Sequence, residues 1–220
     1  MNRSHRNDVA QAMRMPHVEP GMAVGLFGGS FNPPHRGHVL VTDTALRRLK
    51  LDQLWWMITP GNPLKDTAGL AGLAERLQWC RSLMRDPRVR FTTFEAARGS
   101  RYTEESLRFV QARNHGVHFV WIMGADNLAG FHRWQNWRSI AERVPIAVID
   151  RPGSTLAYLS SKMAKTYDFA RVDEDDAALL ARMQPPAWTF IHGPRSPVSS
   201  TAIRNGEAGA AHFRHKGRSQ

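Results

Sequence analysis

Two histidines three residues apart, His35 and His38, stand out in this sequence as side chains that could do chemistry together. They close a segment rich in glycine and proline, GGSFNPPHRGH at residues 28–38, which follows a short apolar run and precedes helical apolar spacing. Such a loop leaves backbone N–H groups uncovered at a helix start, where the helix dipole favours negative charge. With two side chains beside it that can carry positive charge, the loop is a predicted phosphate-binding site.

Other interpretations of this loop are weaker. Its glycine spacing matches neither a Walker A sequence nor a dinucleotide G-x-G-x-x-G fingerprint. Two histidines on one helix face could hold zinc, but no cysteine or glutamate lies nearby in the sequence, so we expect no metal ligands from the protein. A structural role for both histidines is the remaining alternative if the loop acts alone.

A second candidate lies near the other end of the chain, where residues 199–204 read SSTAIR. Hydroxyl side chains at the start of a helix can accept hydrogen bonds from its free N–H groups, and an anion can bind the N–H groups that remain. Arg204 follows Ser200 by four residues, so both lie on the same face of the helix. Taken alone, this motif is better explained as an ordinary capped helix with an exposed arginine. Together with the first loop, it predicts a second contact for an anion.

Both motifs must be positioned by the elements around them, and short apolar runs alternate with helical patterns along the chain. This alternation predicts an α/β fold, a Rossmann-like doubly wound parallel sheet with flanking helices, whose ligands bind beyond the carboxyl ends of the strands. The expected strands cover residues 23–27, 54–58, 89–94, 117–123, 145–149 and 188–192. The expected helices cover residues 37–49, 73–84, 103–114, 134–143, 157–164 and 175–183, with a last helix starting at Ser199 or Ser200.

The composition narrows the classes of protein. A chain of 220 residues suits one main domain, and we expect a disordered extension at residues 1–22, the domain at 23–206 and a flexible basic tail at 207–220. The net charge is +11, of which the two end segments supply only +1 and +2, so the domain itself is basic and should favour anionic ligands. No apolar run is long enough to span a membrane, and no secretion signal is recognisable in residues 1–22. The single cysteine, Cys80, fits a reducing cytoplasm.

The two anion-binding motifs in this order resemble the paired signatures of the nucleotidylyltransferase superfamily with its H-x-G-H motif. Four further segments match in the same order, which makes the resemblance far more specific than any single motif. They are PGNPLK at residues 60–65, Arg101-Tyr102-Thr103, Gly124-Ala125-Asp126 with Trp134 downstream, and Arg151-Pro152-Gly153. Within the superfamily, the chain is most similar to members that join ATP and nicotinate mononucleotide, giving deamido-NAD and pyrophosphate in NAD biosynthesis.

The resemblance implies roles for individual residues. Contacts to ATP would come from Gly28, Gly29, Ser30, Phe31, His35, His38, Gly124, Asp126, Ser200, Thr201 and Arg204. Among these, His35, His38 and Arg204 would take part in catalysis on the phosphates, and Asp126 would bind the ribose of the adenosine. The acceptor would be bound by Lys65, Tyr102, Thr103, Trp134 and Arg151, with Trp134 stacked on the pyridine ring.

The same resemblance implies direct in-line attack of the acceptor phosphate on the α-phosphorus of ATP, without a covalent intermediate. Mg²⁺ would be held mainly by the ATP phosphates. Two alternatives stay open: a sister adenylyltransferase that uses nicotinamide mononucleotide or phosphopantetheine, and a basic nucleic-acid-binding module. The second is less favoured because no basic run interleaved with aromatic residues occurs in the sequence, so we expect neither a nucleic acid nor a membrane as partner.

Overall fold

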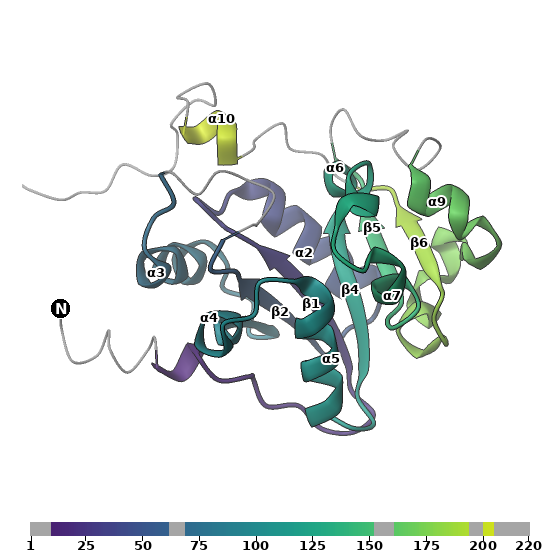
Figure 1. The fold of residues 1–220 in the computed structure, drawn as a ribbon, viewed down its shortest axis with the longest axis horizontal. Helices are drawn as coiled ribbons and strands as arrows, with labels where there is room; N and C mark the ends of the chain where they lie inside the picture. The colour runs from purple at the N-terminus through teal and green to yellow at the C-terminus, as the bar shows by residue number, and fades with distance from the viewer. Residues whose placement is uncertain (1–9, 62–68, 152–160, 194–199, 205–220) are drawn as a thin grey trace, which may run out of the picture.

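The computed structural model describes residues 10–61, 69–151, 161–193 and 200–204. Six strands form one sheet in the order β3-β2-β1-β4-β5-β6, and each neighbouring pair is parallel (Figure 1). The strands are β1 (Ala23–Gly29), β2 (Gln53–Ile58), β3 (Val89–Thr92), β4 (His118–Gly124), β5 (Ile146–Ile149) and β6 (Trp188–Ile191). Each of the six predicted apolar runs is therefore a strand of this sheet.

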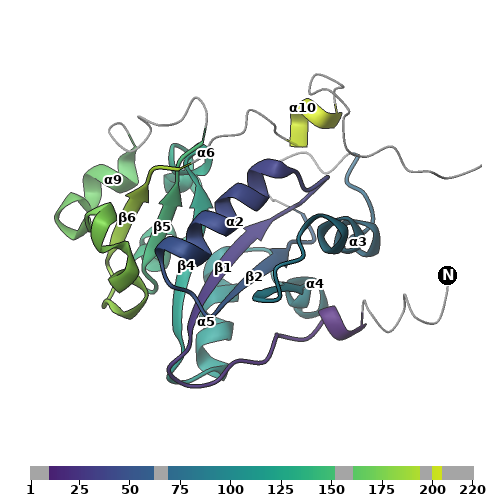
Figure 2. The same cartoon turned by 180° about the vertical axis from the view of Figure 1, so that it is seen from behind.

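Helices cover both faces of the sheet, as the two opposite views show (Figures 1 and 2). Helices α2 and α3 pack on one face, and α4, α5 and α7 pack on the other, which confirms the predicted doubly wound architecture. The α-helices are α2 (Arg36–Arg48), α3 (Leu73–Leu83), α4 (Phe94–Arg98), α5 (Thr103–Arg113), α6 (Ala125–Leu128), α7 (Trp137–Ala141), α9 (Lys162–Thr166) and α10 (Ser200–Arg204). Short 3-10 segments are η1 (Phe131–Arg133), η2 (Asp168–Ala170) and η3 (Glu174–Arg182).

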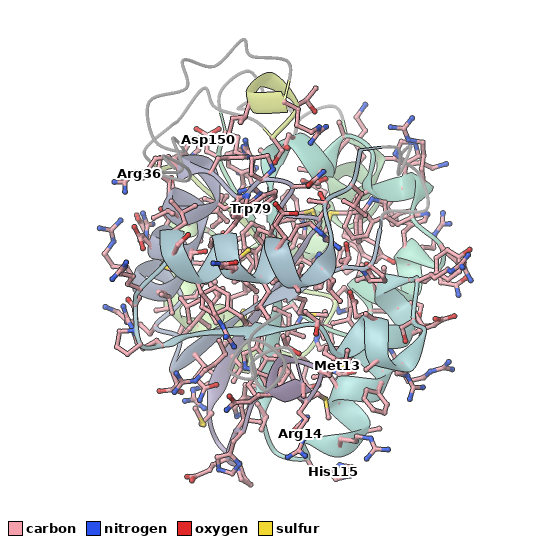
Figure 3. All side chains as sticks on the ribbon, turned by 90° about the vertical axis from the view of Figure 1, so that its left-hand side faces the viewer. Met13, Arg14, Arg36, Trp79, His115 and Asp150 are labelled. Carbon is pink, nitrogen blue, oxygen red and sulfur yellow. The ribbon has the colours of Figure 1, made fainter. Side chains whose placement is uncertain are left out.

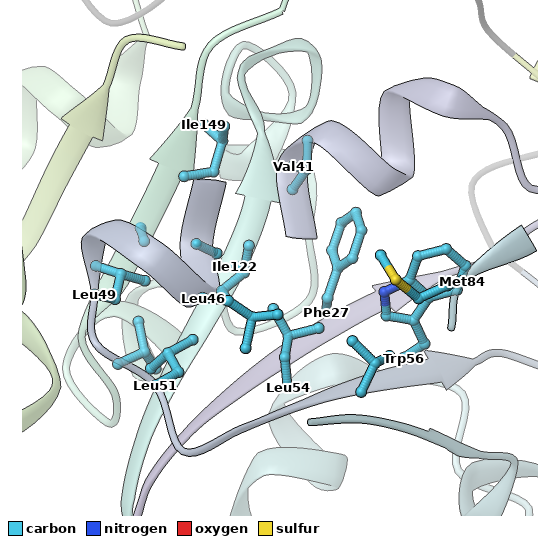
Figure 4. Packing of buried hydrophobic residues seen from close by; sticks show 14 of the residues in the cluster. Phe27, Val41, Leu46, Leu49, Leu51, Leu54, Trp56, Met84, Ile122 and Ile149 are labelled. Atoms are coloured by element: carbon cyan, nitrogen blue, oxygen red, sulfur yellow. The ribbon is translucent and has the colours of Figure 1, made fainter. Parts of the chain in front are cut away.

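The core consists of two apolar layers, one on each side of the sheet, because successive strand residues point to opposite faces. In β2, Leu54 and Trp56 enter the layer under α2, whereas Trp55 and Met57 enter the layer under α5. Figure 4 shows the first layer, in which Leu46 of α2 packs near Leu54 and Trp56. A strand buried on both faces has no polar side to show, which explains why these strands are continuous apolar runs in the sequence.

The strand order determines where a ligand can bind. From β1 the chain continues to β2 on one side, whereas β4 lies on the other side of β1, so the order reverses between β1 and β4. The loops that follow these two strands diverge toward opposite faces and leave a crevice at their carboxyl ends. The sheet thus brings the residue 28–38 loop next to the segment that follows residue 124.

One expected strand is shorter than predicted. Strand β3 ends at Thr92, and the residues expected to complete it begin α4 instead. The Thr92 hydroxyl donates to the carbonyl oxygens of Ala12 and Arg14, at 3.1 and 2.9 Å, and the Thr93 N–H donates to the Ala12 oxygen at 2.7 Å. The N-terminal segment therefore takes the hydrogen bonds that a longer β3 would need, and the chain turns away from the sheet.

Two expected helices are also shorter or differently wound. The helix expected over residues 134–143 is only α7, preceded by η1, and the segment expected at 175–183 is the 3-10 stretch η3. The helix expected over 157–164 lies partly outside the described residues, and α9 begins after Ser161, whose hydroxyl accepts from the Ala164 N–H at 3.0 Å. Side-chain caps thus fix where α9 and η3 begin, since Asp173 likewise accepts from the Asp175 N–H at 2.9 Å.

The division of the chain at residue 22 stays a prediction, but the structure adds contacts for residues 10–22. Ala12 is buried, and Met15, Val18 and Met22 pack against the apolar layer under α5. Figure 3 shows Met13 and Arg14 at the end of the molecule opposite Arg36 and Asp150. In the described part of the chain, no helix is long and apolar enough to cross a membrane.

Candidate active site

A cavity of about 620 Å³ opens at the carboxyl ends of β1 and β4. Helix α10, from the far end of the chain, lies above this end of the sheet (Figure 1). The predicted ATP residues that line the cavity are Gly28, Gly29, Ser30, His35, His38, Gly124, Asp126, Ser200, Thr201 and Arg204. The predicted acceptor residues that line it are Tyr102, Thr103, Trp134 and Arg151. The fold therefore collects nearly all the predicted residues around one space.

Two predicted residues are not among those that the structure places at the cavity. The Phe31 side chain is buried and stacks on Trp56, with ring centroids 4.6 Å apart, so only its backbone could contribute to a nucleotide site. Lys65 lies outside the described residues. The ring of Phe31 instead fixes the loop to the core, with a positive φ of 46° at its backbone.

The two histidines hold each other in place at the start of α2. The Nδ1 atom of His35 accepts from the Gly37 N–H at 3.1 Å, and the Nδ1 atom of His38 accepts from the His35 N–H at 3.1 Å. The ring centroids lie 3.9 Å apart. With both Nδ1 atoms used as acceptors, each neutral ring carries its proton on Nε2, which remains available to donate to a ligand.

Both rings are poor bases in this setting. Burial, and then the nearby positive charge of Arg151, lower the pKa of His35 from 6.5 to about 4. Burial, His35 and Arg151 hold the pKa of His38 well below its usual range. The sequence led us to expect side chains that can carry positive charge, whereas without a bound anion these rings are neutral near pH 7. They supply hydrogen-bond donors, and Arg151 supplies the charge.

The lowered pKa of His35 makes a prediction about stability. Between about pH 4 and 6.5 the unfolded chain binds a proton that folded His35 does not, so this residue's contribution is present above pH 6.5 and is lost as the pH falls. We expect roughly 2 kcal/mol of unfolding free energy to be lost between pH 7 and 4.5 through His35. Urea unfolding of the wild type and His35→Asn across this range tests it, because asparagine keeps an acceptor for the Gly37 N–H but does not titrate. Parallel pH curves for the two proteins would contradict the prediction.

The second motif docks directly on the first loop. The Ser200 hydroxyl donates to the carbonyl oxygen of Pro33 at 2.9 Å, and Arg204 Nη1 donates to that of Asn32 at 2.6 Å. A second guanidinium nitrogen, Nη2, lies 3.3 Å from the Thr201 hydroxyl. The two ends of the chain thus form one wall of the cavity, and Arg204 is partly used in holding it together.

Arg76 of α3, a buried arginine that was not predicted from the sequence, forms hydrogen bonds with the backbone of the residue 28–38 loop. Its Nη1 donates to the carbonyl oxygens of Ser30 at 2.7 Å and Thr59 at 2.8 Å, and its Nε donates to that of Ala71 at 2.9 Å. Arg76 is only 2% exposed, and no acidic side chain in the described residues forms an ion pair with it. A buried cation bound to neutral carbonyl groups ties the loops after β1 and β2 to each other.

Asp126 and Arg151 form the opposite wall, beside the end of β4. Arg151 Nε lies 3.7 Å from Asp126 Oδ1, and the arginine side chain is mostly buried while the aspartate is half exposed. Gly124 permits this arrangement, because a Cβ atom there would lie 2.7 Å from Arg151 Cδ. Asp126 therefore starts α6 already engaged by a cation, and a ribose hydroxyl would have to share it.

The acceptor half of the cavity is aromatic on one side and polar on the other. Trp134 is partly buried and meets Trp121 edge-on at 6.1 Å and Phe131 at 5.2 Å, measured between ring centroids. Tyr102 precedes α5, and no side chain caps the free N–H groups of its first turn. An aromatic ring beside an uncapped helix start can hold a flat ring that carries a negative charge.

Further residues line the cavity without having been predicted for it. They are Phe27, Asn32, Thr59, Gly61, Leu70, Glu95, Arg101, Trp121, Ile122, Met123, Asn127, Arg133 and Gln135. Arg101 and Gln135 are sequence neighbours of predicted residues, so adjacency could have suggested them. Glu95 could not be found in this way because it adjoins no predicted site residue and directly follows the strand expected over residues 89–94.

The side chains around the cavity indicate how a metal ion could be bound. In the parts of the chain that the structure describes, no group of three or more His, Cys, Asp or Glu side chains is placed to hold one. The acidic side chains that line the cavity are Asp126 and Glu95. Mg²⁺ keeps several waters and takes few protein ligands where phosphates are present, so these residues are compatible with it.

Comparison with known sequences gives consistent results. The model of the family described as cytidylyltransferase-like matches residues 26–206. A protein of Mesorhizobium japonicum named probable nicotinate-nucleotide adenylyltransferase is 67% identical over 190 residues, which cover 86% of this chain and 97% of that protein. A protein of Brucella suis with the same name is 64% identical over 183 residues, covering 83% of this chain and 94% of that protein.

Solved structures show the same fold at low sequence identity. The nicotinic acid mononucleotide adenylyltransferase of Plasmodium falciparum complexed with APC matches with a TM-score of 0.61 and 15% identity, covering 84% of this chain and 83% of that chain. The complex of that enzyme with NaAD matches with a TM-score of 0.55 and covers 83% of this chain and 82% of that chain. The sequence relatives carry the assignment further: the chain belongs to the nicotinate-nucleotide adenylyltransferases within the cytidylyltransferase-like family.

Proposed function

We propose that this protein transfers AMP from ATP to nicotinate mononucleotide, giving deamido-NAD and pyrophosphate in NAD biosynthesis. The observation that carries the proposal is one cavity lined by three parts of the chain. They are the loop with His35 and His38, helix α10, and the acceptor residues Tyr102 and Trp134. The names of relatives that are 64–67% identical support the same reaction. Structures of the Plasmodium enzyme, which share this fold, are complexes with APC and with NaAD, and they support nucleotide binding by this protein.

The chemistry requires little from the protein beyond positioning. An oxygen of the acceptor's phosphate attacks the α-phosphorus of ATP, a P–O bond forms there, and the bond to the bridging oxygen of the β-phosphate breaks. Pyrophosphate leaves with the electrons of that bond, and the acceptor's phosphate needs no general base. The work left to the protein is to align the two phosphates and to stabilise negative charge as it develops.

The side chains around the cavity suit these tasks. His35 and His38 would donate Nε2–H to oxygens of the α- and β-phosphates, while Arg151 and Arg204 would supply positive charge. Gly28, Gly29 and Ser30 would let the triphosphate approach the backbone, and Ser200 and Thr201 would contact it from α10. ATP would enter as its Mg²⁺ complex, in which the phosphates provide most of the metal's ligands.

On the acceptor side, Trp134 would stack on the pyridine ring. The uncapped first turn of α5, after Tyr102 and Thr103, would bind the carboxylate through N–H groups. Lys65 is a further candidate contact for a phosphate. A sister reaction with nicotinamide mononucleotide or phosphopantetheine would use the same ATP side and differ only here.

A product assay tests the proposal. The protein is incubated with ATP, Mg²⁺ and one acceptor at a time, nicotinate mononucleotide, nicotinamide mononucleotide or phosphopantetheine, and pyrophosphate and the dinucleotide are measured. We expect the highest kcat/KM with nicotinate mononucleotide. Turnover with only the second or third acceptor would replace the proposed substrate. If no acceptor reacts and mixed oligonucleotides bind in a salt-dependent way, the nucleic-acid alternative would replace the enzyme.

A further inference from the structure

Glu95 is a buried carboxyl group at the acceptor end of the cavity to which no role has been assigned above. It lies in the first turn of α4, is 6% exposed and borders the cavity. One oxygen, Oε1, accepts from the Ser106 hydroxyl at 2.6 Å. Because Glu95 is both buried and part of the cavity lining, its carboxyl group can contact a ligand bound there.

Its contact with Ser106 places this carboxyl close to the predicted acceptor contacts. Ser106 follows Thr103 by three residues and Tyr102 by four, so all three lie on the same side of the start of α5. The carboxyl is therefore about one helical turn, roughly 5 Å, from the uncapped first turn. At that separation, an ionised Glu95 would repel a second carboxylate bound at the helix start, whereas a protonated Glu95 would not.

We propose that Glu95 is a specificity residue that distinguishes nicotinate mononucleotide from nicotinamide mononucleotide. Protonated Glu95 permits the carboxylate of nicotinate mononucleotide to bind. Ionised Glu95 repels that carboxylate and so favours the neutral amide of nicotinamide mononucleotide. This inference rests on the proposed function. Burial raises the pKa of Glu95 to about 7, against the smaller lowering effect of the Ser106 hydrogen bond. The change of protonation therefore falls in the neutral pH range.

The charged groups around Glu95 do not account for its raised pKa. On α4 itself, Arg98 stacks on the Phe109 ring at 3.9 Å. On α5, Glu104 pairs with Arg143 at 3.5 Å, while Glu105 and Arg108 lie further along the helix. Arg101 and Tyr102 precede α5, and Arg14 lies on the N-terminal segment. Strand β2 carries no titratable side chain, and His35, His38, Asp126, Arg133 and Arg151 also line the cavity but are not among the causes of the raised pKa. Burial raises the pKa of Glu95, and the Ser106 hydrogen bond opposes that shift without cancelling it.

The test is the ratio of kcat/KM for nicotinate mononucleotide to kcat/KM for nicotinamide mononucleotide, measured from pH 6 to 8. The acceptors' phosphate and the two histidines titrate equally in both reactions, so they cancel in the ratio. We expect the wild-type ratio to fall about tenfold over this range, following the protonated fraction of a group with a pKa of about 7. Glu95→Gln, which is always uncharged, should give a ratio that does not change with pH.

Matched variants separate this effect from a loss of charge or packing. Glu105→Gln removes a carboxylate from α5, the helix that carries Ser106, and should follow the wild-type curve. Ser106→Ala removes the hydroxyl that lowers the pKa of Glu95, so the fall in the ratio should move to higher pH. A flat wild-type ratio, or a Glu95→Gln curve equal to that of the wild type, would overturn the proposal. Failure of both acceptors to react would instead refute the proposed function.

A binding measurement on the wild type keeps the proposal testable if Glu95→Gln does not fold. Titration calorimetry at pH 7.5, in two buffers with different ionisation enthalpies, counts the protons taken up with each acceptor. We expect greater proton uptake with nicotinate mononucleotide than with nicotinamide mononucleotide, because only the carboxylate favours protonated Glu95. Equal uptake for the two acceptors would refute it.

Discussion

We expect His38→Asn to lower kcat about 100- to 1,000-fold, the loss usually found when one preorganised donor to a developing charge is removed. Asparagine places an amide close to the position of His38 Nδ1, so it can keep the hydrogen bond from the His35 N–H. It cannot reach the position of Nε2, which is the atom proposed to donate to the phosphates. The variant therefore separates the structural hydrogen bond from the catalytic one.

His38→Gln is the matched control because its longer side chain places an amide near the Nε2 position but not near Nδ1. We expect it to keep more activity than His38→Asn even if it is the less stable of the two. Steady-state pyrophosphate release gives kcat, and thermal unfolding shows that each variant is folded. Near-wild-type turnover of folded His38→Asn would remove His38 from the proposed chemistry.

The protonation of His38 should depend on whether ATP is bound. Burial and neighbouring positive charge lower its pKa, and a bound triphosphate carries the opposite charge, so ATP should raise it. The ring can then gain charge only when the phosphates are present. This differs from the picture drawn from sequence, in which the histidines were expected to bring charge to the site themselves.

The six strands and the common location of the motifs could be predicted because both follow from local patterns. Parallel strands buried on two faces are apolar along their length, and each motif directly follows one of them. Phe31 shows what a motif cannot predict, because its position in the loop does not indicate that its ring stacks on Trp56. Stacking across 25 residues of chain depends on the assembled core.

Glu95 and Arg76 could not be predicted for a related reason. Glu95 follows a run that looks like a strand to its end, and the turn into α4 depends on hydrogen bonds that Thr92 and Thr93 donate to the carbonyl oxygen of the distant residue Ala12. Arg76 lies in a helical pattern where arginine is ordinarily on the surface. Its burial follows only from the carbonyl groups of Ser30 and Thr59, which belong to two other loops.

The buried Arg76 gives the largest expected effect on stability. We expect Arg76→Met to lower the free energy of unfolding by about 3–5 kcal/mol, because three partly buried carbonyl groups lose their donor while methionine restores only part of the side-chain volume. Arg85→Met, an exposed substitution of the same type after α3, should change it by no more than about 0.5 kcal/mol. Urea unfolding at pH 7 measures both.

Replacing Arg76 should weaken the binding of ATP more than the binding of the acceptor. Arg76 holds the backbone at Ser30 and Thr59, which line the cavity next to the histidine loop, and it has no described contact with the acceptor residues. We expect Arg76→Lys, which keeps the charge but cannot reach all three carbonyl groups, to raise the KM for ATP more than the KM for nicotinate mononucleotide. Equal increases in the two KM values would mean that Arg76 only supports the fold, since a general loss of structure would not distinguish the ATP side from the acceptor side.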